Sequence, residues 1–169
     1  AYVIGAARGG GQGQVVNLDV RRRVASVALP GLPHLGSGIS WRHGDRTVLA
    51  TPNLKEGVIS VIDMQTWKEI RRIPTPGPGF FLRSHEHSRY AWVDSMMSPA
   101  RDTLTVIDKA TLEPVARLTP APGKTVAHIE FTRDGRYALA SVWEDDGALI
   151  IYDADKLVEV KRIPMRKPV

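Results

Sequence analysis

Four aspartates recur in this chain at intervals of 44, 45 and 45 residues, and each closes a short apolar run: Asp19, Asp63, Asp108 and Asp153. Each aspartate is followed by a polar turn, a second amphipathic run and a segment rich in proline and glycine, which is the pattern of a β-hairpin followed by a loop. A period of about 45 residues built from short strands is typical of β-propeller blades, because a single blade cannot bury its own faces. The repeat therefore predicts an all-β propeller.

A second hairpin lies between each loop and the next aspartate, so that one repeat holds four antiparallel strands. Its three copies pair residues 39–41 with 47–51, 80–83 with 90–94, and 128–131 with 137–142. The expected blades are 1–31, with outer strands only, followed by 32–78, 79–123 and 124–169. Propellers close with about four to eight blades. We therefore expect these three to four blades to belong to a larger propeller, and Ala1 to lie inside a strand of a longer protein.

The composition is that of an ordinary globular domain, with 169 residues, 43% of them hydrophobic, and a net charge of +5. The absence of cysteine excludes disulfides, thiolate metal sites and a covalently attached c-type haem within this segment. No run approaches the roughly 20 apolar residues of a membrane span, and there is no signal-peptide pattern. The basic runs 21–23, 71–72 and 161–162 lack interleaved aromatic residues, so we interpret them as solvated outer strands and not as a nucleic-acid surface.

The meander topology sorts the loops onto two rims of the propeller. Loops that enter an innermost strand, and loops that join the second strand to the third, lie at one end, whereas both hairpin turns lie at the other. The first rim is expected to carry residues 32–38, 52–57, 75–79, 95–102, 121–125 and 144–147. Binding residues concentrate on loops held by a rigid scaffold, and these loops are longer and more varied than the turns. We therefore expect the functional site on the first rim.

Position on the rims distinguishes the five histidines. Three of them, His43, His85 and His87, fall in or beside tight turns of the opposite rim and are interpreted as water-exposed polar residues. His34 precedes one innermost strand and His128 opens another, so both are expected at the mouth of the central channel. Imidazole is a common ligand of haem iron and a common carrier of protons near neutral pH. Two interpretations stay open: a convergent functional pair, or hydrogen-bonded structural residues.

Other chemical motifs are weak. The chain has no His-Glu-x-x-His, no Walker-type loop and no nucleophile elbow with a Ser-His-Asp order. The glycine-rich residues 9–13 precede a strand and not a helix, which favours a flexible loop over a phosphate site. The acidic residues 144–146 are interpreted as part of a hairpin connection. The repeating aspartates are interpreted as residues that accept hydrogen bonds from the backbone of their own turns.

Three segments resemble the d1-haem propeller of cytochrome cd1 nitrite reductase and its relatives: residues 32–38, 80–94 and 130–135, the last followed by Ser141-Val142-Trp143. The resemblance extends over nearly the whole chain. Within the family, the chain most resembles the dihydro-haem d1 dehydrogenases, which complete d1-haem biosynthesis. It implies an eight-bladed periplasmic propeller with a separate c-type haem domain towards its N-terminus. The chain would then form the last three to four blades and bind haem d1, or dihydro-haem d1 as a substrate.

The family's site residues can be carried over one by one. His34 matches a histidine that lies over the open face of the haem in the nitrite reductases. Their motif is Pro-His-Pro-Gly-Arg-Gly, whereas this chain has Leu35 for the second proline and Ser37 for the arginine, which weakens a reductase assignment. His128 has no histidine counterpart in the reductases and suits proton and electron transfer on the macrocycle. The expected cofactor-binding residues are His34, His128, Trp143 and Arg8, with His34 as the metal ligand, His34 and His128 as the catalytic pair, and core packing as the alternative role of Trp143.

The resemblance implies an oxidoreductase that removes two electrons and two protons from a propionate of dihydro-haem d1 to form an acrylate. Electrons would leave through the upstream c-type haem to a c-type cytochrome, and cytochrome cd1 nitrite reductase is the expected partner in denitrification. The alternatives are a nitrite reductase d1 domain, a non-catalytic d1-haem carrier or assembly protein, and a generic propeller interaction module.

Overall fold

The computed structural model describes residues 1–6 and 11–168, and the regular structure in them is almost entirely β-strand. The strands are β1 (Tyr2–Ala6), β2 (Gln12–Asn17), β3 (Arg22–Ala28), β4 (Ile39–His43), β5 (Arg46–Pro52), β6 (Val58–Asp63), β7 (Lys68–Pro74), β8 (Leu82–Ser84), β9 (Tyr90–Asp94), β10 (Leu104–Asp108), β11 (Glu113–Leu118), β12 (Val126–Phe131), β13 (Tyr137–Val142), β14 (Ala148–Asp153) and β15 (Val158–Pro164). A short 3₁₀ turn, η1 (Leu35–Ser37), precedes β4. Within this part of the chain, no helix has the length and apolar character that a bilayer crossing requires.

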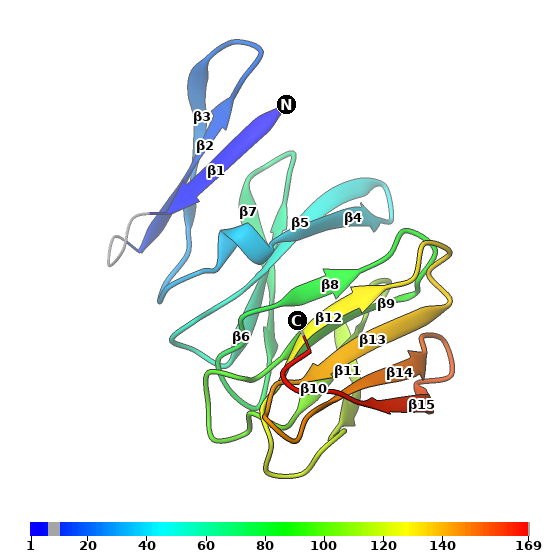
Figure 1. Cartoon of the computed structure of the whole chain (residues 1–169). Helices are drawn as coiled ribbons and strands as arrows, with labels where there is room; N and C mark the ends of the chain where they lie inside the picture. Colours follow the sequence, from blue (N-terminus) through cyan, green and yellow to red (C-terminus); the bar gives the residue numbers. More distant parts are fainter. Residues whose placement is uncertain (7–10, 169) are drawn as a thin grey trace.

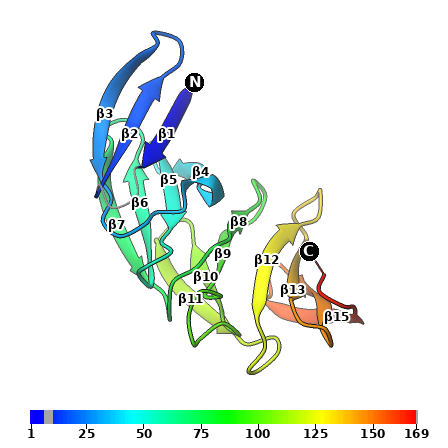
Figure 2. The ribbon, with the colours of Figure 1, turned by 60° about the vertical axis from the view of Figure 1, so that its left-hand side comes forward.

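Within the described residues, the strands form four antiparallel meander sheets: β1-β2-β3, β4-β5-β6-β7, β8-β9-β10-β11 and β12-β13-β14-β15. The sheets follow one another in an arc, with β4, β8 and β12 along its inner side and β3, β7 and β11 along its outer side (Figure 1 and Figure 2). The inner strands β8 and β12 contact each other, as do the outer strands β3 and β7. The predicted all-β propeller of four-stranded blades is confirmed.

The first sheet differs from the prediction of an outer hairpin alone. The two predicted strands correspond to β2 and β3, but β1 pairs with β2 along its whole length, from Tyr2 opposite Asn17 to Ala6 opposite Gly13. This extra strand takes the place that β5 and β9 take in their sheets. A strand was expected at Ala1, but its pairing with β2 as a third strand of this sheet was not, because Gly5 and Ala6 weaken the pattern of β-branched and aromatic residues that marks a strand.

The hydrophobic core lies between neighbouring sheets. One cluster joins Trp92 and Val106 of the third sheet to Ile129 and Ile150 of the fourth, and similar clusters join the second sheet to the third and the first to the second. All residues of β10 are buried because both faces of this strand are covered, whereas the outer strand β11 alternates between exposed and half-buried positions. Each sheet therefore depends on its neighbours, as propeller blades do.

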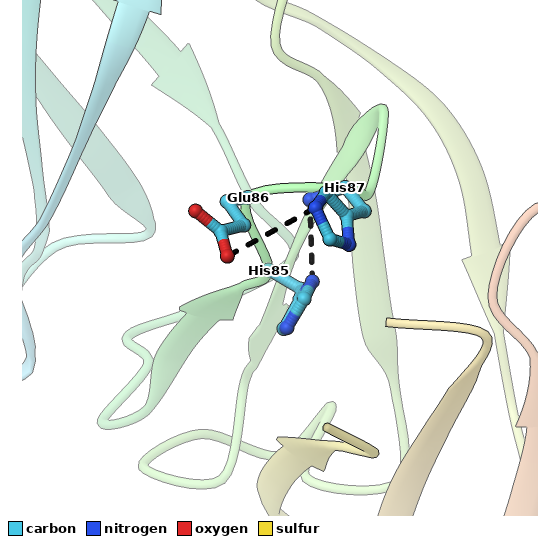
Figure 3. A group of neighbouring side chains, drawn as sticks. All are labelled: His85, Glu86 and His87. Carbon is cyan, nitrogen blue, oxygen red and sulfur yellow. Dashed lines mark hydrogen bonds and ion pairs between the residues drawn. The ribbon is translucent and has the colours of Figure 1, made fainter. Parts of the chain in front are cut away.

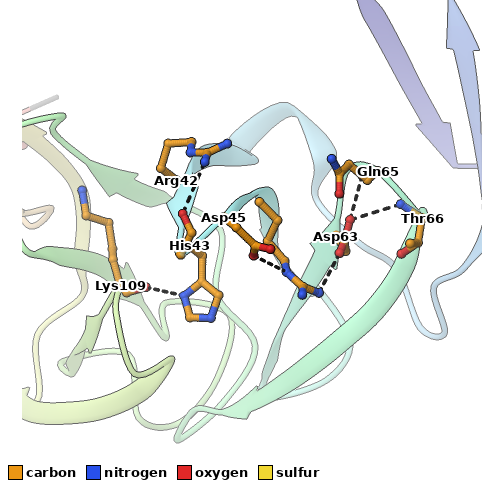
Figure 4. Close-up of polar contacts among 9 residues, drawn as sticks. Arg42, His43, Asp45, Asp63, Gln65, Thr66 and Lys109 are labelled. Carbon is orange, nitrogen blue, oxygen red and sulfur yellow. Dashed lines mark hydrogen bonds and ion pairs between the residues drawn. The ribbon is translucent and has the colours of Figure 1, made fainter.

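The repeating aspartate closes the third strand of a sheet and bonds the turn that follows. Asp63 Oδ1 accepts hydrogen bonds from the backbone N–H groups of Gln65 at 2.7 Å and Thr66 at 3.1 Å (Figure 4). Asp108 and Asp153 accept the equivalent pairs of bonds. The predicted turn role is confirmed for these three residues.

In the first sheet the turn is made by Asn17 and not by Asp19. Asn17 Oδ1 accepts from the backbone N–H groups of Asp19 at 2.8 Å and Val20 at 3.3 Å. Asp19 lies two residues past the end of β2, and its own backbone N–H is one of the two donors to Asn17. The prediction that Asp19 is a member of the repeat was therefore wrong, because an asparagine oxygen satisfies the same two donors.

Protonation of these aspartates should destabilise the fold. Hydrogen bonds from the backbone of Thr66 and Gln65 hold the pKa of Asp63 below its usual value, and a bond from Lys156 lowers the pKa of Asp153 in the same way. Because the folded-state pKa lies below that of the unfolded chain, about 3.9, the stability that these groups contribute is fully present above that pH and is lost as the pH falls through the folded-state pKa. We expect the urea concentration at the midpoint of unfolding to be lower at about pH 3 than at pH 7.

The control for this prediction is Asp63→Asn, which keeps the acceptor oxygen, as Asn17 does in the first sheet, but cannot titrate. Its urea midpoint should change less with pH than that of the unsubstituted protein. Superimposable pH profiles for the two proteins would contradict the assignment.

Candidate functional site

His34 lies on the first rim, immediately before η1, with its ring fixed by a neighbouring blade. Its backbone N–H donates to the carbonyl of Pro52 at 2.8 Å, and its Nδ1 lies 2.8 Å from the carbonyl oxygen of Phe80. A carbonyl can only accept, so Nδ1 carries the proton and donates. In the neutral imidazole, this tautomer leaves the lone pair on the second ring nitrogen, Nε2. A backbone hydrogen bond that fixes the tautomer in this way is the usual arrangement of a metal-ligating histidine.

His128 lies at a β-bulge in the first strand of the fourth sheet. The ladder between β12 and β13 pairs Ala127 with Ser141 and then Ile129 with Ala140, so His128 has no cross-strand partner of its own. Its φ angle is 51°, in the left-handed region that few residues other than glycine adopt. Bulges redirect a side chain and are over-represented next to active sites. The sequence placed His128 in a strand but did not reveal this bulge.

The two histidines are the ends of a row of four aromatic rings, with two phenylalanine rings between them. The ring centroids of His34 and Phe80 are 4.0 Å apart, those of Phe80 and Phe81 4.7 Å, and those of Phe81 and His128 3.8 Å. We call His34, Phe80, Phe81 and His128 the aromatic row. The structure thus brings the two predicted histidines to one rim, but two phenyl rings separate them.

An apolar cavity of about 220 Å³ opens beside the His128 end of the aromatic row. It is lined by Phe80, Phe81, Met96, Met97, His128 and Trp143. Trp143 is 42% exposed, so the alternative that it packs in the core is wrong, and its ring is available to a ligand. Flat aromatic and flexible thioether side chains suit a large planar apolar molecule.

Asp94 holds the backbone that carries the two phenylalanines. It is fully buried; its Oδ1 accepts from the N–H groups of Phe80 and Met96, each at 3.0 Å, and its Oδ2 accepts from that of Phe81 at 2.6 Å. Burial raises the pKa of Asp94, and these three hydrogen bonds oppose that rise. Gly79 packs against the same strand end, where a Cβ atom would overlap the carbonyl oxygen of Asp94. The carboxylate therefore joins the loop before β8 to the loop after β9, and both of these loops contribute residues to the cavity.

Asp94, Phe80 and Phe81 were not predicted as site residues from the sequence. A usable signal was present, because a polar residue at the end of the second strand recurs in the preceding blade. There Asn53 Oδ1 accepts from the backbone N–H groups of Leu32, Lys55 and Glu56. The repeat of this residue predicts which loops are joined, although it does not predict what they bind.

The remaining predicted residues lie elsewhere. Arg8 lies outside the described residues. His87 is exposed, as predicted, but His43 and His85 are half-buried, which contradicts their interpretation as water-exposed. His43 is partly covered because its Nδ1 hydrogen-bonds the carbonyl of Lys109 on the next blade at 3.1 Å (Figure 4).

The propeller fold and the aromatic row on its rim are those of a haem-binding β-propeller, and the match to a known family agrees with this class. Residues 4–169 match the Cytochrome D1 heme domain family, and the chain belongs to this family, as the sequence resemblance predicted. It is 57% identical over 167 residues to the dihydro-heme d1 dehydrogenase of Pseudomonas aeruginosa strain PAO1, a match that covers 99% of this chain and 34% of that protein. It is also 30% identical over 138 residues to Protein NirF of Stutzerimonas stutzeri, covering 81% of this chain and 33% of NirF.

Solved structures show the same relationship. The structure of dihydro-heme d1 dehydrogenase NirN in complex with DHE matches with a TM-score of 0.96 at 56% identity, over 99% of this chain and 36% of that one. Hydrazine synthase of Kuenenia stuttgartiensis matches with a TM-score of 0.78 at 18% identity, over 98% of this chain and 46% of that one, and shares the fold alone. The chain spans about a third of the length of the curated relatives that it matches.

Proposed function

We propose that the protein to which this chain contributes oxidises dihydro-haem d1 to haem d1, converting a propionate side chain to an acrylate. The observation that carries this proposal is the aromatic row, which ends in His34 and His128 on the rim of a propeller that matches the dihydro-heme d1 dehydrogenase of P. aeruginosa at 57% identity. The imidazole of His34, which a backbone hydrogen bond holds in place, would ligate the iron. The imidazole of His128 would accept a proton.

The residues of the rim fit a planar iron macrocycle. The side chains of Trp143, Met96 and Met97 offer apolar contact to its face, and the Nε2 lone pair of His34 is free to ligate the metal. The cavity of about 220 Å³ is smaller than the usual ligand site of about 300–1,000 Å³. It would therefore form one wall of a larger pocket, in agreement with a chain that makes up part of a propeller.

The reaction needs a base and an exit for electrons. Conversion of CH₂–CH₂ to CH=CH releases two protons and two electrons. We assign iron ligation to His34 and proton acceptance to His128, which has no cross-strand partner at its bulge. His128 would accept the two protons one after the other and release each to solvent water. The electrons would pass to a c-type haem in an upstream domain and from there to a c-type cytochrome. Haem d1 functions in nitrite reduction, so periplasmic cytochrome cd1 nitrite reductase is the proposed recipient, and the proposed compartment is the periplasm.

Ser37 favours the dehydrogenase over a nitrite reductase. It occupies the position at which the reductase motif has an arginine, and only 1% of its surface is exposed. A small buried hydroxyl cannot supply the positive charge that arginine places near a bound anion. At this position the chain therefore lacks the arginine that contributes charge near the haem and the anion in the reductases.

The test uses the protein expressed from its complete gene. Anaerobic addition of dihydro-haem d1 together with an artificial electron acceptor should convert the visible spectrum of the substrate to that of haem d1, whereas haem b should remain unchanged. Binding without conversion would replace the proposal with a haem carrier, and consumption of nitrite by the haem d1 form would replace it with a reductase. Absence of any spectral change would contradict all three.

A further inference from the structure

A second group of potential ligands lies at the far end of β8 from the aromatic row. The turn between β8 and β9 carries His85, Glu86 and His87 in succession (Figure 3). One ligand atom from each residue lies within 4.8 Å of those of the other two. His87 Nε2 is 3.9 Å from Glu86 Oε1, and the two imidazole centroids are 5.1 Å apart. Two imidazoles and a carboxylate therefore converge at one point of the opposite rim.

The position of His85 is fixed by the neighbouring blade. Its ring lies 6.4 Å from that of Phe131, centroid to centroid, and against Gly135, where a Cβ atom would overlap the imidazole. Gly135 has a φ angle of 72°, which suits glycine. The carbonyl of His85 also accepts a hydrogen bond from Lys109 Nζ at 2.9 Å. One ligand of the group is thus held in place by contacts from outside its own turn.

The other two ligands are free to move onto a cation. The side chains of His87 and Glu86 are 68% and 81% exposed. Three ligand atoms around a tetrahedral zinc ion lie roughly 3.3 Å apart, given metal–ligand distances of about 2.0–2.2 Å. Small rotations of the two exposed side chains toward His85 would bring the observed separations to that value. His85 Nδ1 accepts a 3.2 Å hydrogen bond from the His87 backbone N–H, and a cation bound at this nitrogen would replace that donor.

We propose that His85, Glu86 and His87 bind a divalent transition-metal cation of the Zn²⁺ type, with water completing the coordination. Imidazole nitrogen favours zinc and copper over calcium and magnesium, which prefer oxygen alone. Two histidines and a glutamate with one open position form a ligand set known in zinc proteins. The site is separate from the proposed haem site because the length of β8 lies between them, and it does not depend on the proposed function.

The test is calorimetric titration of ZnCl₂ into the tag-free protein expressed from its complete gene, after removal of adventitious metal with EDTA. The unsubstituted protein should show saturable binding, and His87→Ala should weaken it at least tenfold. His43→Ala, which removes a turn histidine from the same rim, is the matched control and should bind as the unsubstituted protein does. X-ray absorption at the zinc edge should show two imidazole ligands, and one in the His87→Ala protein.

The rim of the aromatic row contains other imidazoles that could take up zinc. The double substitution His34→Ala with His128→Ala removes them, and saturable binding should persist in that protein. Loss of binding there, equal affinity in the His87→Ala and His43→Ala proteins, or no saturable binding at all would each overturn the proposal.

Discussion

Substitution of His128 by asparagine is expected to lower the rate of dihydro-haem d1 oxidation by about 100-fold or more, because a positioned general base contributes about 10²–10⁴. Asparagine is the informative replacement, since it tolerates the left-handed backbone that His128 adopts at φ 51°. The bulge in β12 should therefore survive while the imidazole is lost. The measurement is the single-turnover rate of acrylate formation, followed by the visible spectrum in the protein expressed from its complete gene.

His34 supplies the comparison. If His34 ligates iron and His128 takes the proton, His34→Ala should change the spectrum of the bound substrate before any turnover, whereas His128→Asn should leave that spectrum intact and slow its conversion. His43→Ala, on the opposite rim, should alter neither. An unchanged rate in the His128→Asn protein would show that His128 takes no part in the reaction. A changed spectrum of the substrate bound to the same protein would show that His128, and not His34, ligates the iron.

The fold was predictable because propeller blades repeat. The polar residue that ends each third strand marks a turn that the backbone must make in every blade, so a period in the sequence becomes a period in space. The first sheet departs from the repeat of aspartates, because Asn17 accepts there the two hydrogen bonds predicted for Asp19. Hydrogen-bond acceptance, and not the identity of the residue, is what repeats.

The site was predictable only in part. Meander topology places His34 and His128 on one rim, because it requires only the order of strands and loops. The contacts that join them do not follow from strand order: the row passes through Phe80 and Phe81 of the blade between them. The bulge at His128 depends on the register against β13, which hydrophobic alternation does not specify to one residue.

Substitution of Asp94 by asparagine is expected to lower the free energy of unfolding by about 1–3 kcal/mol, the cost of leaving one buried donor unsatisfied. The carboxylate accepts from the backbone of Phe80 and Met96 through Oδ1 and from that of Phe81 through Oδ2. An amide has one acceptor oxygen, and its NH₂ group can only oppose the third N–H. Urea unfolding should report the loss, with Asp45→Asn as the control because that side chain is 89% exposed.

The same substitution should also weaken substrate binding, because Asp94 fixes the segment whose two phenyl rings line the cavity and contact both histidines. Without one of these hydrogen bonds, the Phe80-Phe81 backbone adopts more conformations, and a smaller fraction of the protein has the binding-competent one. The affinity for the substrate therefore falls although no atom that contacts it is removed. The expected signature is a weaker affinity for dihydro-haem d1 with an unchanged spectrum of the bound form. A destabilised protein that binds with unaltered affinity would show that the carboxylate supports the blade and does not position the site.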